Sequence, residues 1–255
     1  MSDFISNGNA DREPGARPYA KMSARTIRFF WLVDGSSSMS GSKIESLNNA
    51  IRQAIPMMQS AAEENPTAKL HISTIKFADS AEWIQKDGTP IEDFKWSDIN
   101  ANGLTAMGEA LDLITDFMEQ IDKNKEKGMP PVVVLVTDGA ATDDFDKALL
   151  KFNDSRWGNI AVRIAIAIGK DVEMEPLEEF IKNKNGEIKG AVLTANNSEQ
   201  LANHIKFVSS FIIKNASDPN AKSLEKDQIV STFKRHQFTP NALDDSTNQD
   251  DGDLW

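Results

Sequence analysis

Apolar residues recur along the chain with two alternating spacings. Runs rich in β-branched and aromatic side chains are typical of strands, and an unbroken run indicates a strand that is largely buried. These runs cover residues 26–33, 69–77, 81–84, 131–137, 160–168 and 190–194. Apolar residues three or four positions apart indicate amphipathic helices instead. These segments cover residues 42–65, 105–125, 143–152, 176–183 and 198–213.

The alternation of strands with helices predicts an α/β fold. A strand formed by the unbroken β-branched run at 131–137 would have to be buried on both faces, as a central strand of a parallel sheet is. Pro56 lies inside the first predicted helix and could kink it. Residues 85–103 contain two glycines and a proline and are expected to form a long loop. We therefore expect a doubly wound, mostly parallel sheet flanked by helices.

Both ends of the chain differ in composition from its middle. Residues 1–24 are rich in Asn, Gly, Pro and charge, which predicts a flexible N-terminal arm. Residues 25–214 hold the strand and helix pattern and are expected to form one domain. Residues 215–255 predict an acidic, mostly disordered tail, within which 224–238 has the apolar spacing of a transient helix.

The overall composition narrows the classes of function. A net charge of −11 over 255 residues argues against a general nucleic-acid binder and against a partner of anionic membranes. The absence of cysteine excludes disulfides, thiolate nucleophiles and Cys-based zinc sites. No apolar run approaches the roughly 20 residues of a membrane span, and the first residues lack the pattern of a signal peptide. We therefore expect a cytoplasmic protein without a membrane span.

Three polar clusters fall at ends of predicted elements, where an open α/β sheet binds its ligands. Asp34, Ser36 and Ser38 follow the strand at 26–33 at every second position, so their side chains could converge on one point. Thr105 opens a helix, and Asp138 follows the strand at 131–137. Carboxylate and hydroxyl oxygens are hard donors that suit Mg²⁺. Each cluster alone has a simpler explanation, because Ser and Thr often cap helices and Asp-Gly often forms a turn.

Together the three clusters resemble the metal-ion-dependent adhesion site of von Willebrand factor A (vWA) domains. The matching residues are Asp34-x-Ser36-x-Ser38, Thr105 in a Gly-Leu-Thr-Ala turn, and Asp138 in Thr-Asp-Gly. The resemblance covers some three quarters of the chain and implies a Rossmann-like fold. It implies that Ser36, Ser38 and Thr105 ligate Mg²⁺ through hydroxyls, Thr105 sometimes through water, while Asp34 and Asp138 act through bound waters. Mn²⁺ or Ca²⁺ could replace Mg²⁺ there.

The resemblance implies a function in protein interaction rather than catalysis. An ion held mainly by neutral hydroxyls keeps most of its charge and attracts a carboxylate from a partner protein. Within the family, Thr105 and residues 138–144 look most like the bacterial TerY-type, tellurium-resistance-associated subgroup. Such proteins are often encoded beside a PP2C-like phosphatase and a protein kinase, which suggests these two as partners in a stress-response or signalling system.

A metal-dependent hydrolase is the alternative function. A phosphatase of the haloacid-dehalogenase type also places an Asp after its first strand, but the acid two residues on is replaced here by Ser36. Serine hydrolysis would need a histidine partner. His71, His204 and His236 fall in a strand, in the last helix and in the tail, where structural or solvated roles are expected. No nucleotide-binding glycine motif is present.

Further aspartates have roles other than direct metal binding. Asp143 and Asp144 are expected to start a helix, where the dipole favours negative charge. The tail could place a carboxylate in the metal site, in cis or in a neighbouring molecule, although simple solubility explains its charge as well. The tail aspartates are Asp244, Asp245, Asp250, Asp251 and Asp253.

Overall fold

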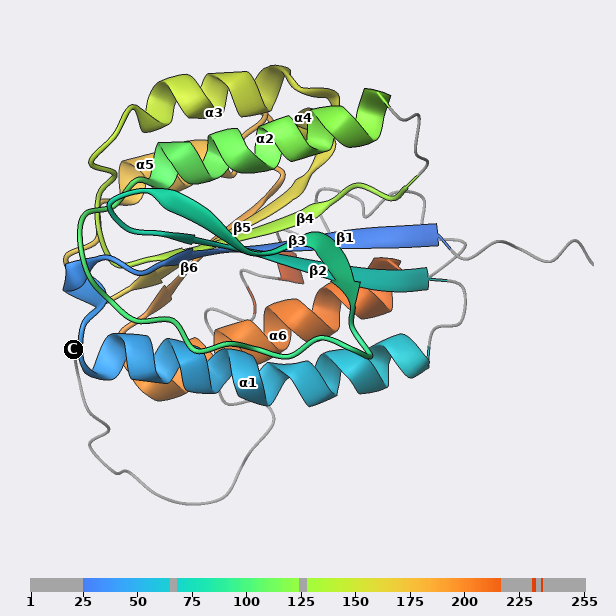
Figure 1. Ribbon diagram of the computed structural model, residues 1–255, viewed down its shortest axis with the longest axis horizontal. Helices are drawn as coiled ribbons and strands as arrows, with labels where there is room; N and C mark the ends of the chain where they lie inside the picture. The colour runs from blue at the N-terminus through green and yellow to red at the C-terminus, as the bar shows by residue number, and fades with distance from the viewer. Residues whose placement is uncertain (1–24, 65–67, 124–127, 217–230, 233–234, 236–255) are drawn as a thin grey trace, which may run out of the picture.

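The computed structural model describes residues 25–64, 68–123, 128–216, 231–232 and 235 (Figure 1). The strands are β1 Arg25–Asp34, β2 Ala68–Phe77, β3 Ala81–Pro90, β4 Val132–Thr137, β5 Val162–Ile168 and β6 Gly190–Ala195. The helices are α1 Ser42–Glu63, α2 Met107–Lys123, α3 Phe145–Asp154, α4 Arg156–Ile160, α5 Met174–Phe180 and α6 Ser198–Ala216, with a short 3-10 helix η1 at Ser37–Met39. The predicted arm, and the predicted tail apart from residues 215–216, 231–232 and 235, lie outside the described residues.

The strands form one sheet in the order β3-β2-β1-β4-β5-β6. Only β2 and β3 are antiparallel, and every other neighbouring pair is parallel. The expected doubly wound, mostly parallel α/β fold is therefore confirmed. The first strand, β1, lies in the middle of the sheet, and the chain winds first toward β3 and then from β4 toward β6. The direction of winding thus reverses between β1 and β4.

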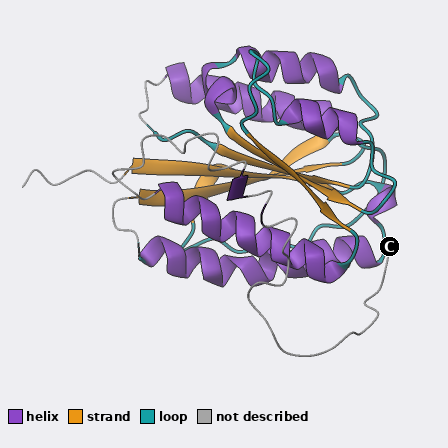
Figure 2. Cartoon of the chain, turned by 180° about the vertical axis from the view of Figure 1, so that it is seen from behind, coloured by secondary structure: helices purple, strands orange, loops and turns teal. Residues whose placement is uncertain are grey.

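Helices cover both faces of the sheet (Figures 1 and 2). Helices α1 and α6 lie on one face, and α2, α3, α4 and α5 lie on the other. Successive side chains of a strand point to opposite faces. Phe29, Trp31 and Val33 of β1 therefore pack in the core under α1 and α6, while Phe30 and Leu32 pack in the core under α2. Cover on both sides explains why β1 is apolar almost without a break.

Strand β3 extends further than the sequence predicted. The strand expected over 81–84 runs over Ala81–Pro90 and takes up part of the loop expected at 85–103. It is an edge strand with half-exposed side chains, and its register against β2 shifts around Thr74. Such a strand carries polar residues in place of a regular apolar alternation, so the apolar pattern could not reveal its second half.

A buried arginine ties α4 and α5 to the sheet. Arg163 of β5 is fully buried, and its guanidinium donates hydrogen bonds to the carbonyl oxygens of Gly158, Phe180 and Lys182. The same guanidinium lies 4.5 Å from the ring centroid of Phe152, a cation–π contact. Burial lowers the pKa of Arg163 to about 9, so the group is still charged at neutral pH. The carbonyls offset this buried charge and fix α4, a helix that the sequence pattern did not predict.

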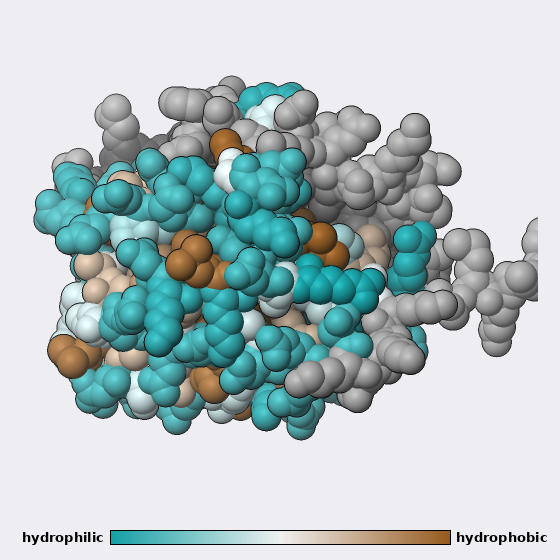
Figure 3. Space-filling model, turned by 90° about the horizontal axis from the view of Figure 1, so that it is seen from above, coloured by the Kyte–Doolittle hydropathy of each residue, from teal (hydrophilic) through white to brown (hydrophobic). Residues whose placement is uncertain are grey.

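The outer surface of the α2, α3 and α4 layer is mainly hydrophilic (Figure 3). Apolar side chains on this face are scattered and do not merge into one patch, as is usual for a monomer surface. Among the described residues, no helix is both long and apolar enough to cross a membrane. The expectation of a chain without a membrane span therefore holds for that part of the protein, while its cytoplasmic location stays a prediction.

Helix α1 continues through Pro56 as a single assigned helix. Pro56 points to solvent, whereas Leu47, Ile51 and Met58 are buried against the sheet. The apolar face of α1 therefore determines the path of the helix, and the local cost of proline is tolerated.

Replacing Pro56 by alanine is expected to raise the free energy of unfolding by about 1–3 kcal/mol, because proline in a helix interior lacks an N–H donor and crowds the preceding turn. Urea denaturation followed by circular dichroism measures the change. Gln53→Ala, an exposed change on the same helix, is the control and should shift the free energy by less than about 0.5 kcal/mol. A Pro56→Ala protein no more stable than wild type would contradict the prediction.

Candidate metal centre

The candidate site lies at the carboxyl ends of β1 and β4, where the direction of winding reverses. The two strands are parallel neighbours, with Val33 opposite Val136. This register places Asp34, the last residue of β1, level with Thr137, the last residue of β4. The polar residues that follow both strands therefore meet at one edge of the sheet, which is where open α/β folds bind ligands.

Asp34 is a buried carboxylate held by two hydrogen bonds. Its Oδ1 accepts from the Ser36 backbone N–H at 2.7 Å, and its Oδ2 accepts from the Thr137 hydroxyl at 2.5 Å. Burial raises the pKa of Asp34, the hydrogen bonds from Thr137 and Ser36 oppose that rise, and the nearby charge of Asp138 adds to it. A cation close by would favour the ionised form of this carboxyl.

The two serine hydroxyls form a hydrogen-bonded chain that ends at Asp138. Ser36 Oγ lies 2.9 Å from Ser38 Oγ, and the Ser38 hydroxyl donates to Asp138 Oδ1 at 2.7 Å. Ser36 is only 2% exposed, whereas Ser38 faces solvent. The two hydroxyls meet as the sequence predicted, but the 3-10 turn η1, rather than strand-like alternation, brings them together. Their role as metal ligands stays a prediction.

Thr105 is brought to the same edge by its backbone. Three loops meet at this edge: the first follows β1, the second precedes α2 and contains Thr105, and the third follows β4. The second loop is bonded to the first, because Asn102 N–H donates to Gly35 O at 2.7 Å and Ser37 N–H donates to Gly103 O at 3.0 Å. Thr105 is 6% exposed. Its place beside the first loop, and not a side-chain contact, makes its hydroxyl oxygen a candidate ligand.

The third loop is tied to the second through Thr142. Thr105 N–H donates to the Thr142 hydroxyl at 3.0 Å, and Thr142 N–H donates back to Thr105 O at 2.9 Å. The first and third loops are joined in turn by the contacts of Asp34 with Thr137 and of Ser38 with Asp138. Each of the three loops is therefore hydrogen-bonded to the other two.

Asp143 caps a helix, but not the one expected. Its carboxylate accepts from the N–H groups of Gly108 at 2.9 Å and Glu109 at 2.8 Å, which are free donors in the first turn of α2. Asp144 does start its own helix, since it caps α3 by accepting from Lys147 N–H. The expectation that both aspartates begin one helix is therefore wrong for Asp143. The explanation of Thr105 as the side-chain cap of α2 is wrong as well, because Asp143 takes that role.

Lys43 is a site residue that the sequence analysis missed. Its ammonium, in the first turn of α1, donates to Asp138 Oδ2 at 2.6 Å. A lysine at a helix N-terminus opposes the helix dipole. That unfavourable position was the available signal that Lys43 has an acidic partner elsewhere in the fold.

The donor set fits a hard divalent cation. The described residues contain no cluster of three or more His, Cys, Asp or Glu side chains that could hold a metal. An ion at this edge would therefore depend on the hydroxyls of Ser36, Ser38 and Thr105, with Asp34 and Asp138 beside them. Oxygen donors of this kind suit Mg²⁺, Mn²⁺ or Ca²⁺ better than Zn²⁺ or copper.

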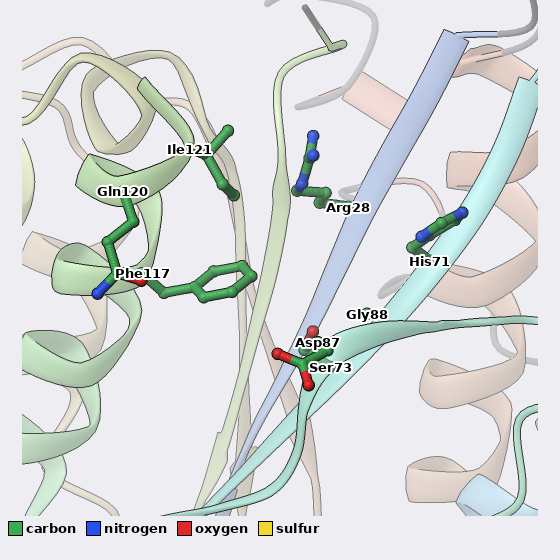
Figure 4. Close-up of a pocket in the computed structure, with 8 residues that line it drawn as sticks. All are labelled: Arg28, His71, Ser73, Asp87, Gly88, Phe117, Gln120 and Ile121. Carbon is green, nitrogen blue, oxygen red and sulfur yellow. The ribbon is translucent and has the colours of Figure 1, made fainter. Parts of the chain in front are cut away.

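Neither described histidine lies between β1 and β4: His71 is toward the other end of the sheet, and His204 is against β6, two strands from β4. His71 lines a pocket of about 220 Å³ toward the opposite end of the sheet, together with Arg28 and Asp87 (Figure 4). His204 is buried in α6, with Nε2 2.9 Å from the Thr194 carbonyl oxygen. Neither described histidine contacts Ser36 or Ser38. His236 lies outside the described residues.

Replacing Asp34 by asparagine is expected to leave the metal-free protein as stable as wild type or up to about 2 kcal/mol more stable, because a neutral amide avoids the cost of burying a charge and still accepts from Ser36 N–H. Thermal melting in EDTA tests this. The variant should also lose most of the rise in melting temperature that Mg²⁺ gives the wild type. A variant that is clearly less stable in EDTA would contradict the first part.

Replacing Asp143 by alanine is expected to cost about 1 kcal/mol of unfolding free energy through the lost cap of α2. It should also weaken Mn²⁺ binding, because α2 begins next to Thr105. Asp144→Ala is the matched control, since it removes the same charge and a cap of α3 but not the contact with α2. Urea denaturation and calorimetric Mn²⁺ titration measure both effects. Equal Mn²⁺ affinities in the two variants would contradict the link to Thr105.

Comparison with known proteins agrees with this architecture. The family model described as the von Willebrand factor type A domain matches residues 30–207. A comparison with curated proteins gave no match. A von Willebrand factor type A structure from Catenulispora acidiphila is similar at TM-score 0.54 and 15% identity, covering 75% of this chain and 43% of that chain. The PilB minor pilin from Streptococcus sanguinis is similar at TM-score 0.54 and 14% identity, covering 76% of this chain and 62% of that chain.

The pilus adhesin SpaC from Lactobacillus rhamnosus GG is a third similar structure, with TM-score 0.58 and 10% identity over 75% of this chain and 31% of that chain. The chain spans less than two thirds of the length of each of these structures. At these identities the likeness shows the fold alone. The match of the family model over most of the chain goes further: the chain belongs to the von Willebrand factor type A domain family.

Proposed function

We propose that this protein is a Mg²⁺-dependent interaction module that binds an acidic side chain of a partner protein. The observation that carries the proposal is the convergence of Asp34, Ser36, Ser38 and Asp138 in one hydrogen-bonded network, with the buried Thr105 held beside it by its loop. vWA domains are typically protein-interaction or adhesion modules, which favours this class over catalysis.

Each residue has a distinct task in this proposal. Ser36, Ser38 and Thr105 would hold the ion through hydroxyl oxygens, and Asp34 and Asp138 would orient those hydroxyls and the bound waters. A bound Mg²⁺ supplies an electrophilic centre that accepts one further oxygen ligand. Because the direct ligands from this chain are neutral, an anionic oxygen from the partner is favoured in that position.

The surroundings of the site suit a protein rather than a small polar ligand. Leu104, next to Thr105, is 59% exposed although its backbone is anchored, since Leu104 N–H donates to Asp79 Oδ1 at 2.9 Å. This exposed leucine beside Thr105 would offer a partner protein one apolar contact next to the proposed ion. Hydrolysis would need a general base, but His71 lies toward the other end of the sheet and His204 is bonded to Thr194 of β6, two strands from β4.

The finer assignment is to a TerY-type system. Thr105 and the stretch 138–144 resemble that bacterial, tellurium-resistance-associated subgroup. We therefore propose a PP2C-like phosphatase and a protein kinase as the first candidates for the partner, in a stress-response or signalling role in the bacterial cytoplasm. The acidic tail beyond residue 240 is a further candidate source of the carboxylate, and it lies outside the described residues.

Metal binding and partner capture test the proposal together. Calorimetric titration with Mg²⁺ or Mn²⁺ should show one site, and Ser36→Ala or Asp138→Ala should weaken it about 10-fold to 100-fold. Pull-down from the native host in Mg²⁺ should retain a partner that EDTA releases. Ser60→Ala, an exposed change on α1 far along the helix, should behave like wild type. Unchanged partner binding in EDTA would refute metal dependence.

A further inference from the structure

The Lys43–Asp138 ion pair places a cation of this chain inside the proposed metal site. Lys43 Nζ lies 2.6 Å from Asp138 Oδ2, and the side chains are 22% and 0% exposed respectively. A pair this close and this sheltered interacts more strongly than a surface salt bridge. We propose that Lys43 sets the charge of the site, so that it weakens metal binding and strengthens binding of the partner's carboxylate. This inference rests on the proposed function.

The geometry allows Lys43 to stay in place when the site is loaded. The two oxygens of Asp138 have separate partners, because Oδ1 accepts from the Ser38 hydroxyl and Oδ2 accepts from Lys43. The proposed ligand hydroxyl and the ammonium therefore use different oxygens of one carboxylate. The ion and Lys43 do not have to exchange places on Asp138.

Lys43 makes the net charge that a partner meets at the ion-loaded site positive rather than neutral. Asp34 and Asp138 contribute two negative charges, and Lys43 leaves one of them uncompensated. A divalent ion then brings the site to one net positive charge, which attracts a carboxylate. Without Lys43 the same ion would bring the site only to neutrality, and the attraction would be weaker.

The same charge acts in the opposite direction on the metal. An ammonium bonded to Asp138 repels a divalent ion held beside that carboxylate and reduces the negative potential that attracts the ion. The N-terminus of α1 adds positive potential of its own at this point. Loss of Lys43 should therefore tighten metal binding and weaken carboxylate binding. A purely structural salt bridge would not produce these opposite changes.

Lys43→Met and Lys43→Arg separate the two roles, because methionine keeps an apolar stem and arginine keeps the charge. Calorimetric titration with Mn²⁺ alone should show about tenfold tighter binding to Lys43→Met and wild-type affinity for Lys43→Arg. Lys182→Met is the matched control, since Lys182 forms an equally short ion pair with Glu179 on the surface away from the site. It should leave the Mn²⁺ affinity unchanged.

Acetate is the carboxylate probe. Water-proton relaxation of the Mn²⁺-loaded proteins should show that acetate displaces bound water at several-fold higher concentration in Lys43→Met than in wild type. Melting in EDTA shows that each variant is folded. Wild-type protein that binds no Mn²⁺ would refute the proposed function and this inference together. If wild type binds Mn²⁺ and Lys43→Met binds it no more tightly, only the role of Lys43 is refuted.

Discussion

The parallel pairing of β1 with β4 is the constraint on which the candidate site depends. Because Val33 lies opposite Val136, the two strands end at the same level, and Asp34 meets the hydroxyl of Thr137. A slip of one residue would turn Asp34 toward the wrong face of the sheet and separate it from Thr137. The apolar side chains on both faces of β1 hold this register, so the core and the polar edge are fixed by the same contacts.

The sequence predicted those parts of the structure that a local pattern of residues determines. The buried strands could be predicted from unbroken apolar runs. The meeting of Ser36 and Ser38 was predicted as well, but from strand-like alternation, whereas a 3-10 turn produces it. The edge strand β3 was only half predicted, because its polar residues show no regular alternation. Lys43 and Asp143 could not be assigned from the sequence. Lys43 bonds a partner 95 residues away, and Asp143 bonds two partners 35 and 34 residues away. Only folding brings these residues together.

Buried charged side chains are stabilised in two different ways in this fold. Among the described residues no carboxylate pairs with Arg163, and its guanidinium donates to backbone carbonyls instead. Asp34 and Asp138 instead rely on donors from hydroxyls, a backbone N–H and a lysine. The arginine environment is closed by rigid backbone groups and serves the packing of α4 and α5. The aspartate environment is made of side chains that can reorient, which suits a site that accepts a ligand.

The three loops at the carboxyl edge form a closed ring of contacts, since each loop is hydrogen-bonded to both of the others. A closed ring is redundant: when one contact is broken, the loops it joined remain connected through the third. Movement of any one loop must also carry along the other two. Binding of a ligand at the site would therefore move the three loops together. This movement would be transmitted to α2 through Asp143 and to α1 through Lys43.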